Sequence, residues 1–343
     1  MQEPMPTPQP LEEQEGVDAD RFQAEIVPAN RPVLLRGLAR SWPAVAAATG
    51  TPDEAVAYLA RFDRGAEVEA FIAPPGHDGR YFYRPDMAGF NFDKRRGPFA
   101  EVVRSVAAVA GKPGAPRIYA GAAAIPEAMP GFTRENPLAH VEAFGAVPRL
   151  WIGNESLVAP HFDESDNLAV AVAGRRRFTI FPPEQVANLY VGPLDFTMAG
   201  QPASMVSLRE PDFGRYPRFR EALAAAFTAE LEPGDAIYIP ALWWHGVEAT
   251  EPFNILVNYW WQAQPAEAGS AFVAMAHAIL SISRLPAPQR AAWRAYFDHY
   301  VFRSESEDPA AHLAPEHRGI LGEPTGALRR RLRDFLVRAL SLL

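Results

Sequence analysis

The chain has 343 residues, of which 48% are hydrophobic and 22% are charged, a composition that excludes a disordered or collagen-like protein. It contains no cysteine, which excludes disulfides, thiolate metal sites and cysteine nucleophiles, so any bound metal must be held by His, Asp, Glu or backbone oxygen. The net charge of −8 disfavours nucleic acid as a principal partner.

The first 16 residues are rich in Pro, Glu and Gln and have little to bury, so we expect a disordered tail. The N-terminus has neither the basic nor the apolar region of a secretory signal. No apolar run approaches the ~20 residues that a membrane-spanning helix needs. We therefore expect a cytoplasmic protein without membrane attachment, and the Ala-, Arg- and Pro-heavy composition suggests a high-GC bacterium.

Residues 17–264 read as one unit of mainly β structure with flanking helices. PVLLRGL predicts a short strand, and TPDEAVAYLARF predicts a helix capped by Thr51. Between about 148 and 262, the short apolar runs PRLWIG, LAVAVAG, RFTIFPP, AELEPGDAIYIP and FNILVNYWW are bounded by turn residues, which is typical of a barrel or sandwich. RFREALAAAFTAEL predicts a helical interruption among them. Because no long linker precedes residue 140, we expect the earlier part to wrap around the barrel.

Residues 265–343 change to a helical period and predict a separate C-terminal helical segment. FVAMAHAILSIS, PQRAAWRAYFDHYVF and ALRRRLRDFLVRALSLL are the three candidate helices. The last has an apolar stripe opposite a basic face, which could lie on a membrane. Packing of this stripe against the protein itself or a second subunit is the favoured alternative, so we expect a homodimer.

The segment APHFDESDN contains the strongest candidate for chemistry. If this segment is extended, His161 and Asp163 point to the same face and can share a metal ion. His245, which follows a Pro-Gly-Asp turn in EPGDAIYIPALWWHGVEA, would complete a facial triad of two histidines and one carboxylate, as found around Fe(II). The alternative is a buried hydrogen-bonded His–Asp pair or a surface loop.

A second signal follows in AVAVAGRRRFTIFPP. Strand alternation places Arg176 on the same face as Phe178 and Ile180, so its guanidinium would point inward and need an anion. A dicarboxylate co-substrate with one end on the metal would meet that need. Pairing with one of the protein's own carboxylates, or a strand shifted by one residue, remains open. Asn258 in FNILVNYWW could face a polar site or be satisfied by backbone.

The run WIGNESLVAPHFDESDNLAVAVAGRRRFTIFPPEQ, followed by EPGDAIYIPALWWHGVEA and FNILVNYWW, resembles the cupin-like JmjC family of Fe(II)- and 2-oxoglutarate-dependent oxygenases. The asparaginyl hydroxylase that acts on hypoxia-inducible factor is the member most similar in style. The resemblance implies a double-stranded β-helix, or jelly roll, in which His161, Asp163 and His245 hold Fe(II). It also implies O2 and 2-oxoglutarate as co-substrates, with release of succinate and CO2 and hydroxylation of a substrate.

The same resemblance implies roles for further residues. By position, Tyr119, Asn167 and Asn258 match polar residues that line the co-substrate pocket, and Trp260 matches an aromatic residue beside it. Ser165 lies beyond the metal pair on the same face and is expected to touch substrate.

Two positions depart from the asparaginyl hydroxylase. Arg176 stands where that enzyme has a lysine for the distal carboxylate, and Val158 stands where it has a threonine. An arginine can still pair a carboxylate, and can do so with two hydrogen bonds.

Three functions are therefore compared. The first is a 2-oxoglutarate-dependent hydroxylase of a protein side chain or small molecule, and the second is a cupin metalloenzyme that works without 2-oxoglutarate, such as a dioxygenase or isomerase. The third is a non-catalytic binding module. The expected partners are a protein, peptide or small-molecule substrate and a second copy of the chain, without nucleic acid.

Overall fold

The structure is a computed structural model that describes residues 4–263, 269–304 and 306–341. Contacts within the chain divide it into two compact units, residues 1–263 and 264–343, and each is described by itself. The boundary that the sequence predicted at residues 264 and 265 lies outside the described residues.

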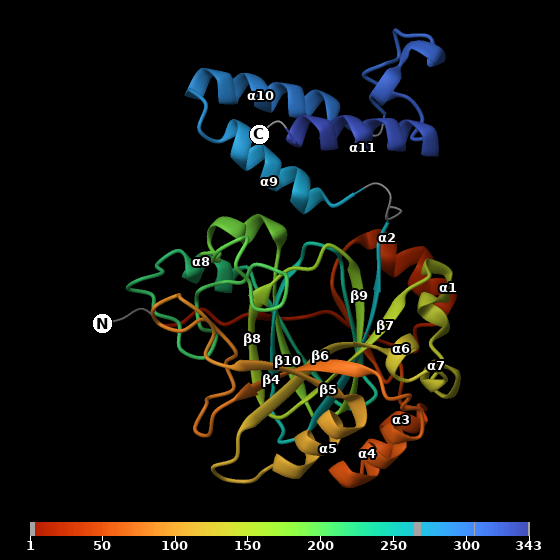
Figure 1. The fold of residues 1–343 in the computed structure, drawn as a ribbon, viewed down its shortest axis with the longest axis vertical. Helices are drawn as coiled ribbons and strands as arrows, with labels where there is room; N and C mark the ends of the chain where they lie inside the picture. The colour runs from red at the N-terminus through yellow and green to blue at the C-terminus, as the bar shows by residue number, and fades with distance from the viewer. Residues whose placement is uncertain (1–3, 264–268, 305, 342–343) are drawn as a thin grey trace. The chain divides into compact units, whose positions relative to one another are not determined.

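The first unit contains two β-sheets (Figure 1). One sheet has five strands in the order β1-β11-β10-β13-β8, and the other has nine in the order β2-β3-β12-β9-β14-β7-β6-β4-β5. The strands are β1 (Gln9–Pro10), β2 (Glu13–Glu15), β3 (Val33–Arg36), β4 (Glu67–Ala73), β5 (Asp93–Pro98), β6 (Arg117–Ala124), β7 (Val147–Gly153), β8 (Ser156–His161), β9 (Asp166–Ala173), β10 (Arg176–Phe181), β11 (Phe227–Leu231), β12 (Ala236–Ile239), β13 (Trp244–Ala249) and β14 (Asn254–Trp261).

Short helices lie between these strands and around them. They are α1 (Ala19–Arg21), η1 (Phe22–Ile26), α2 (Val27–Ala29), α3 (Pro43–Ala48), α4 (Pro52–Ala60), α5 (Phe99–Val109), α6 (Ile125–Ala128), α7 (Phe132–Glu135), η2 (Ala139–Phe144), η3 (Pro183–Ala187) and α8 (Phe219–Ala224). The predicted cap of α4 is confirmed, because the Thr51 hydroxyl accepts from the Glu54 N–H and the Glu54 carboxylate accepts from the Thr51 N–H.

The two sheets pack face to face through an apolar layer. Ala169, Ile237 and Leu256 from the nine-stranded sheet meet Phe178 and Ile180 from the five-stranded sheet. A larger core lies on the other face of the nine-stranded sheet, where the helices before residue 145 cover it. This arrangement confirms a mainly β fold with flanking helices, consistent with a cupin-type jelly roll.

The expected disordered tail is wrong for part of its length. Gln9–Pro10 pairs in parallel with β11, and Glu13–Glu15 pairs in parallel with β3, so this segment adds a strand to each sheet. Leu11 between them is 6% exposed and joins the core between the sheets. Two short strands and one buried leucine order a segment whose composition alone predicts disorder. Residues 1–3 lie outside the described residues.

The helical interruption is shorter than its composition predicts. The helix ends at Ala224, and the continuation Phe227–Leu231 is strand β11, which pairs antiparallel with β10. The free edge of β10 supplies partners for the backbone groups of this segment, so tertiary pairing overrides a helical preference that is intrinsically weak.

The second unit contains the three helices that the sequence predicts, α9 (Ala271–Ile282), α10 (Ala287–Tyr300) and α11 (Gly326–Leu340), with the short turns η5 (Pro315–His317) and η6 (Gly319–Leu321). None of the described residues in α9, α10 or α11 is buried. The chain has no described helix that is both long and apolar enough to cross a membrane.

Candidate active site

The structure brings the three predicted metal ligands together at one end of the five-stranded sheet. His161 is the last residue of β8, Asp163 follows it, and His245 is the second residue of β13. His161 and His245 are direct partners across the antiparallel pair of strands, and the register of β13 shifts just after His245. One potential ligand atom from each of the three residues lies within 4.8 Å of the others.

Backbone contacts orient both imidazoles. The Nδ1 atom of His161 lies 3.0 Å from the carbonyl oxygen of Ala159, and the Nδ1 atom of His245 lies 3.1 Å from that of Trp243. A carbonyl can only accept, so in the neutral form of each ring Nδ1 carries the proton and Nε2 has the free lone pair. The Nε2 atom of His245 lies 3.7 Å from a carboxylate oxygen of Asp163. Both rings therefore present the atom that a metal would bind.

Burial keeps one of these rings neutral. Loss of hydration is the largest effect on His245, and together with the neighbouring His161 it outweighs the attraction of Asp163 and lowers the pKa of His245 to about 4. A neutral imidazole is the form that coordinates a metal. Two neutral imidazoles and one carboxylate are the donor set of the Fe(II) facial triad, so the residues present fit that ion.

A cavity of about 410 Å³ opens beside the three ligands. Its walls come from both sheets and from the segment 197–203. Ala203, at the end of this segment, forms a β-bridge with His161. Five other residues singled out in the sequence line this cavity with the metal ligands, namely Tyr119, Asn167, Arg176, Asn258 and Trp260. Val158 lines it as well.

Arg176 points into the interior, as strand alternation predicts. It is 3% exposed, whereas the next residue, Arg177, is exposed and pairs with Glu230 and Glu248 on the other face. Among the described residues, Arg176 has no carboxylate within ion-pairing distance, and its buried Nε has no hydrogen-bond partner. Loss of hydration lowers the pKa of Arg176 to about 10. The two alternatives to an anion-binding role were a carboxylate partner within the protein and a strand shifted by one residue. Both are therefore wrong.

The register gives the separation between Arg176 and the metal ligands. On β10, Ile180 lies opposite His245 and Arg176 lies opposite Ala249. The four intervening steps along the strand amount to about 13 Å between the backbones at the two positions. Arg176 and the three metal ligands line the same cavity across this separation.

Tyr119 lies on the opposite wall, on β6. It is 8% exposed, and burial raises the pKa of its phenol to about 12, against the opposing effect of the Arg176 charge. The phenol is therefore a neutral hydrogen-bond donor that lies within electrostatic range of the guanidinium.

Asn167 and Asn258 form a buried amide pair on neighbouring strands. The Nδ2 group of Asn258 donates to Oδ1 of Asn167 over 2.8 Å. The Oδ1 atom of Asn258 is buried without a partner among the described residues. Asn258 is therefore not satisfied by backbone alone, and the pair keeps unused polar capacity at the cavity wall.

Two tryptophans close the cavity on this side. Trp260 and Trp151 meet edge to face, with ring centroids 5.9 Å apart, and Trp151 continues the contact to Tyr119 at 5.9 Å. Ser165 is the one predicted site residue that is not among the residues lining the cavity. It is half-buried in the bend between Asp163 and β9, and its expected contact with substrate stays a prediction.

Sequence reasoning missed much of the cavity wall. Phe71 and Lys94 come from neighbouring strands of the nine-stranded sheet, and Tyr81 and Met198 come from loops. The Nζ group of Lys94 donates to the carbonyl of Met198 over 2.7 Å and so connects β5 to the loop over the cavity. The alternation of Glu69, Phe71 and Ala73 along β4 could have indicated one inward face, but nothing in it identifies the cavity it faces.

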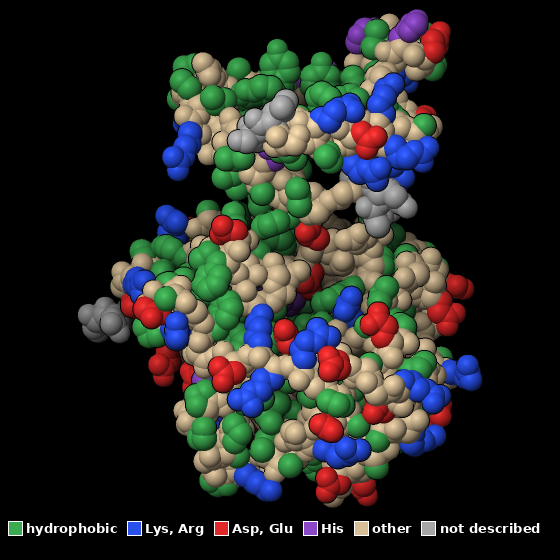
Figure 2. All heavy atoms as spheres, viewed as in Figure 1, with side chains coloured by type: hydrophobic (Ala, Val, Ile, Leu, Met, Phe, Trp, Pro, Cys, Tyr) green, Lys and Arg blue, Asp and Glu red, His purple; other side chains and the backbone are tan. Residues whose placement is uncertain are grey.

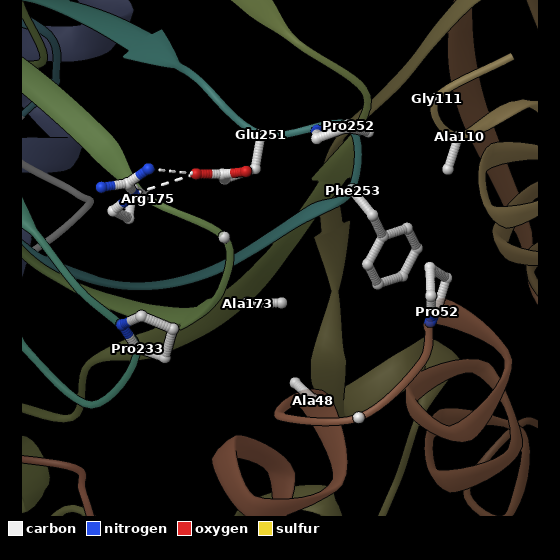
Figure 3. Close-up of a pocket in the computed structure, with 12 residues that line it drawn as sticks. Ala48, Pro52, Ala110, Gly111, Ala173, Arg175, Pro233, Glu251, Pro252 and Phe253 are labelled. Atoms are coloured by element: carbon white, nitrogen blue, oxygen red, sulfur yellow. Dashed lines mark hydrogen bonds and ion pairs between the residues drawn. The ribbon is translucent and has the colours of Figure 1, made fainter.

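Figure 3 shows a second pocket, of about 460 Å³. β9 begins near the metal ligands and ends at Ala173, which lines this pocket. Its charged side chains, Arg175 and Glu251, pair with each other at 2.7 Å, and prolines and Phe253 form much of the rest. Among the described residues that line it, Glu251 is the one potential metal ligand, and it is paired with Arg175, so we place the chemistry in the cavity beside His161, Asp163 and His245.

Comparison with known proteins agrees with this geometry. The model of the Cupin-like domain family matches residues 19–267, which is well over half of the chain. A tRNA wybutosine-synthesizing protein 5 from Gallus gallus is 36% identical over 107 residues, covering 31% of this chain and 30% of that protein. Its Homo sapiens counterpart is 35% identical over the same length, covering 31% of each protein.

An HSPB1-associated protein 1 from Homo sapiens is 36% identical over 118 residues, which cover 34% of this chain and 24% of that protein. The chain thus spans less than a third of the length of the curated relatives it matches. The match of the family model, joined to the two packed sheets and the His-Asp-His cluster, confirms the resemblance to JmjC-type cupins. The chain belongs to the Cupin-like domain family.

Proposed function

We propose that this protein is an Fe(II)- and 2-oxoglutarate-dependent oxygenase that hydroxylates a protein side chain or a small molecule. One observation carries the proposal: the buried, unpaired guanidinium of Arg176 shares one cavity with the His161, Asp163 and His245 cluster. A cupin metalloenzyme that works without 2-oxoglutarate would have no use for such a cation, because a buried charge without a partner is costly.

The residues divide the work by position. His161, Asp163 and His245 would hold the metal on three sides and leave the cavity side open. Bound Fe(II) would supply activation of O2, coupled to conversion of 2-oxoglutarate to succinate and CO2. Arg176 would bind the distal carboxylate with two parallel hydrogen bonds, and the Tyr119 phenol would donate a further one.

The packed wall of the cavity has a separate part in this scheme. The amide pair Asn167–Asn258 would fix the orientation of the co-substrate, since its unused polar groups face the cavity. Trp151, Trp260 and Phe71 would limit the water that reaches the metal ligands. These side chains come from three strands of one sheet, so their positions are held by the sheet itself.

The test is an anaerobic titration of metal-free protein with Fe(II) and then with 2-oxoglutarate, followed by the visible metal-to-ligand charge-transfer band. We expect a saturable band in the wild-type protein. His161→Ala should abolish it, and His299→Ala, on exposed α10, should leave it unchanged as the matched control. Release of succinate in air would then establish turnover.

Two results would contradict the proposal. Iron binding without the band would favour the cupin metalloenzyme that uses no 2-oxoglutarate. Absence of iron binding would favour a non-catalytic binding module.

The substrate is proposed from weaker support. The names of the relatives refer to synthesis of a modified tRNA base and to association with a heat-shock protein, and each match covers only part of those proteins. We propose a protein, peptide or small-molecule substrate in preference to nucleic acid, because the net charge is −8 and acidic and basic side chains are interspersed over the face in Figure 2. Succinate release stimulated by bulk tRNA, and by no peptide or small molecule, would reverse this preference.

We also propose a cytoplasmic homodimer in which the helices of the second unit pair with those of another copy. Val273 and Leu280 on α9 are 63% and 69% exposed, and Tyr296 on α10 and Phe335 on α11 are also largely exposed. Figure 2 shows hydrophobic side chains gathered along these helices. Such faces need a partner. Light scattering should give twice the chain mass, and Leu280→Arg should give a monomer; a monomeric wild-type protein would refute this.

A further inference from the structure

Arg149 is a cation beside the active-site cavity, in contact with two residues that line it, and the proposed function has no use for it. It lies on β7, two residues before Trp151, so both side chains project from the same face of the sheet. It also lies directly opposite Asn258 on β14. Trp151 and Asn258 both line the cavity. Arg149 shares their face of the sheet but is not itself one of the lining residues, so we place it at the rim beside the cavity.

Contacts on two sides hold the guanidinium of Arg149 in place. One of its terminal nitrogens, Nη1, donates to the carbonyl oxygen of Ala122 over 3.1 Å. The guanidinium carbon lies 5.6 Å from the ring centroid of Trp260. Ala122 and Trp260 both line the cavity, so the cation sits between two wall residues.

The acceptor of this hydrogen bond belongs to a distorted part of β6. The pairing of β6 with β7 shifts register between Ala120 and Ala123, and Ala122 has a φ of 54°, in the left-handed region. A Cβ atom on Gly121 would lie 2.6 Å from the Trp151 ring. The bulge is therefore packed tightly against the aromatic wall, and distortions of this kind concentrate at functional sites.

The charge of Arg149 is left uncompensated. The side chain is half-buried, and no carboxylate of the described residues forms an ion pair with it. By contrast, Lys94, on the other side of the cavity, has Glu69 at 3.9 Å and the Met198 carbonyl at 2.7 Å. A guanidinium has five N–H donors, and among the described residues only the Ala122 carbonyl accepts a hydrogen bond from Arg149.

We propose that Arg149 binds an anionic group of the substrate, a carboxylate or a phosphate, at the rim of the cavity. This inference rests on the proposed function, because it assigns the substrate class of the same site. Arg176, on the facing sheet, takes the co-substrate anion, and Arg149 takes the substrate anion. The aromatic rings of Trp260 and Trp151 line the cavity next to Arg149 and suit a ring or other planar group beside the charge.

The experiment uses the full chain, loaded anaerobically with Fe(II) and saturating 2-oxoglutarate so that Arg176 is occupied. Benzoate and phenyl phosphate are titrated separately, with tryptophan fluorescence as the readout because Trp151 and Trp260 adjoin the site. Benzyl alcohol serves as the neutral probe. The variants are Arg149→Gln, which keeps a donor for the Ala122 carbonyl, Arg149→Lys, which keeps the charge, and Arg95→Gln, which removes an exposed cation from β5.

We expect saturable binding of at least one anion and none of benzyl alcohol. Arg149→Gln should weaken that binding roughly tenfold or more, the loss that one charged hydrogen-bond contact represents, whereas Arg149→Lys should keep most of it and Arg95→Gln all of it. Binding of phenyl phosphate alone identifies a phosphate-bearing substrate, binding of benzoate alone identifies a carboxylate, and binding of both shows that the site accepts either anion. The 2-oxoglutarate midpoint of Arg149→Gln should equal that of the wild type.

Several outcomes would overturn the inference: equal anion binding by the wild type and Arg149→Gln, binding of benzyl alcohol as tight as that of benzoate, or no binding of either anion. A raised 2-oxoglutarate midpoint in Arg149→Gln would assign this residue to the co-substrate instead. Failure of the proposed function would give a different experimental result. If the wild type forms no charge-transfer band but still binds the anion through Arg149, the oxygenase assignment fails and the anion site stands.

Discussion

Arg176 should make the ligand-free protein less stable than it would be without this charge. The interior lowers the pKa of its guanidinium from 12.5 to about 10, and at 1.36 kcal/mol per pKa unit this corresponds to about 3 kcal/mol against the charged form. Arg176→Met keeps most of the side-chain volume and removes the charge. We therefore expect the metal-free variant to be more stable than the wild type by as much as ~3 kcal/mol.

Urea unfolding with and without ligand measures this effect. In the presence of metal, 2-oxoglutarate at a hundred times its dissociation constant should stabilise the wild type by about 2.7 kcal/mol, and it should leave Arg176→Met unchanged. Without 2-oxoglutarate, Arg176→Met should therefore have the larger free energy of unfolding. With 2-oxoglutarate, most of the difference from the wild type should disappear. The same substitution should remove the charge-transfer band.

The neighbouring residue provides the matched control. Arg177 is on the same strand but exposed, and it pairs with Glu230 and Glu248, so Arg177→Met should change stability by less than about 1 kcal/mol and leave 2-oxoglutarate binding intact. A metal-free Arg176→Met protein that is clearly less stable than the wild type would refute the reasoning. It would mean that the fold itself compensates this charge.

Three further changes test the fold around the site. Leu11→Ala should cost about 2 kcal/mol or more in urea unfolding, because this leucine is buried between the sheets. Gly121→Ala should cost about 1–3 kcal/mol and alter tryptophan fluorescence, because the new methyl group meets the Trp151 ring. Asn258→Leu should cost about 1–3 kcal/mol by leaving Oδ1 of Asn167 without its donor, and calorimetry should show weaker 2-oxoglutarate binding.

For each of these substitutions, one result would contradict the physical reason given for it. Unchanged stability of Leu11→Ala would mean that the N-terminal segment does not pack as described. Gly97→Ala on β5, whose new methyl group would meet nothing nearer than Val102 at 3.8 Å, controls for Gly121→Ala and should be far milder. If 2-oxoglutarate affinity recovers when Asn167 is also changed to Leu, the amide pair is not part of the co-substrate site.

The metal cluster and the inward arginine could be predicted because each depends on local alternation. His161 and Asp163 are two residues apart, and Arg176 shares its parity with Phe178, so an extended backbone alone fixes their faces. His245 is different, because its strand pairs with the strand of His161, which lies 84 residues earlier in the chain. The turn before it indicates a strand but gives no partner for that strand.

The parts that sequence reasoning missed depend on contacts between distant segments. Arg149 has the same alternating signature as Arg176, two residues before Trp151, but its value as a site residue comes from the Ala122 carbonyl, which a bulge in β6 places beside it. The expectation for Ser165 rests on spacing alone. Its spacing from Asp163 matches a strand, but the chain bends there before β9 begins.

The N-terminal segment shows how composition misleads when pairing partners are remote. Gln9–Pro10 and Glu13–Glu15 look solvated, and both are largely exposed, but their backbones pair with strands on two different sheets. Arg36 strengthens this connection, since its guanidinium bonds Glu13 and Asp235 at 2.7 Å each. A dozen residues thus join both sheets at an edge, which no local pattern of polarity indicates.

The two arginines on facing sheets place one positive charge in the interior and another at the rim of the cavity. Arg176 lies about four residues along its strand from the level of His245, in the interior, where only a ligand can supply an anion. Arg149 lies at the rim, where solvent screens its charge and an arriving anion can displace water at little cost. A diacid that fills the interior first would leave the rim cation as the remaining attraction. If both cations act as proposed, we therefore expect the co-substrate to bind before the substrate.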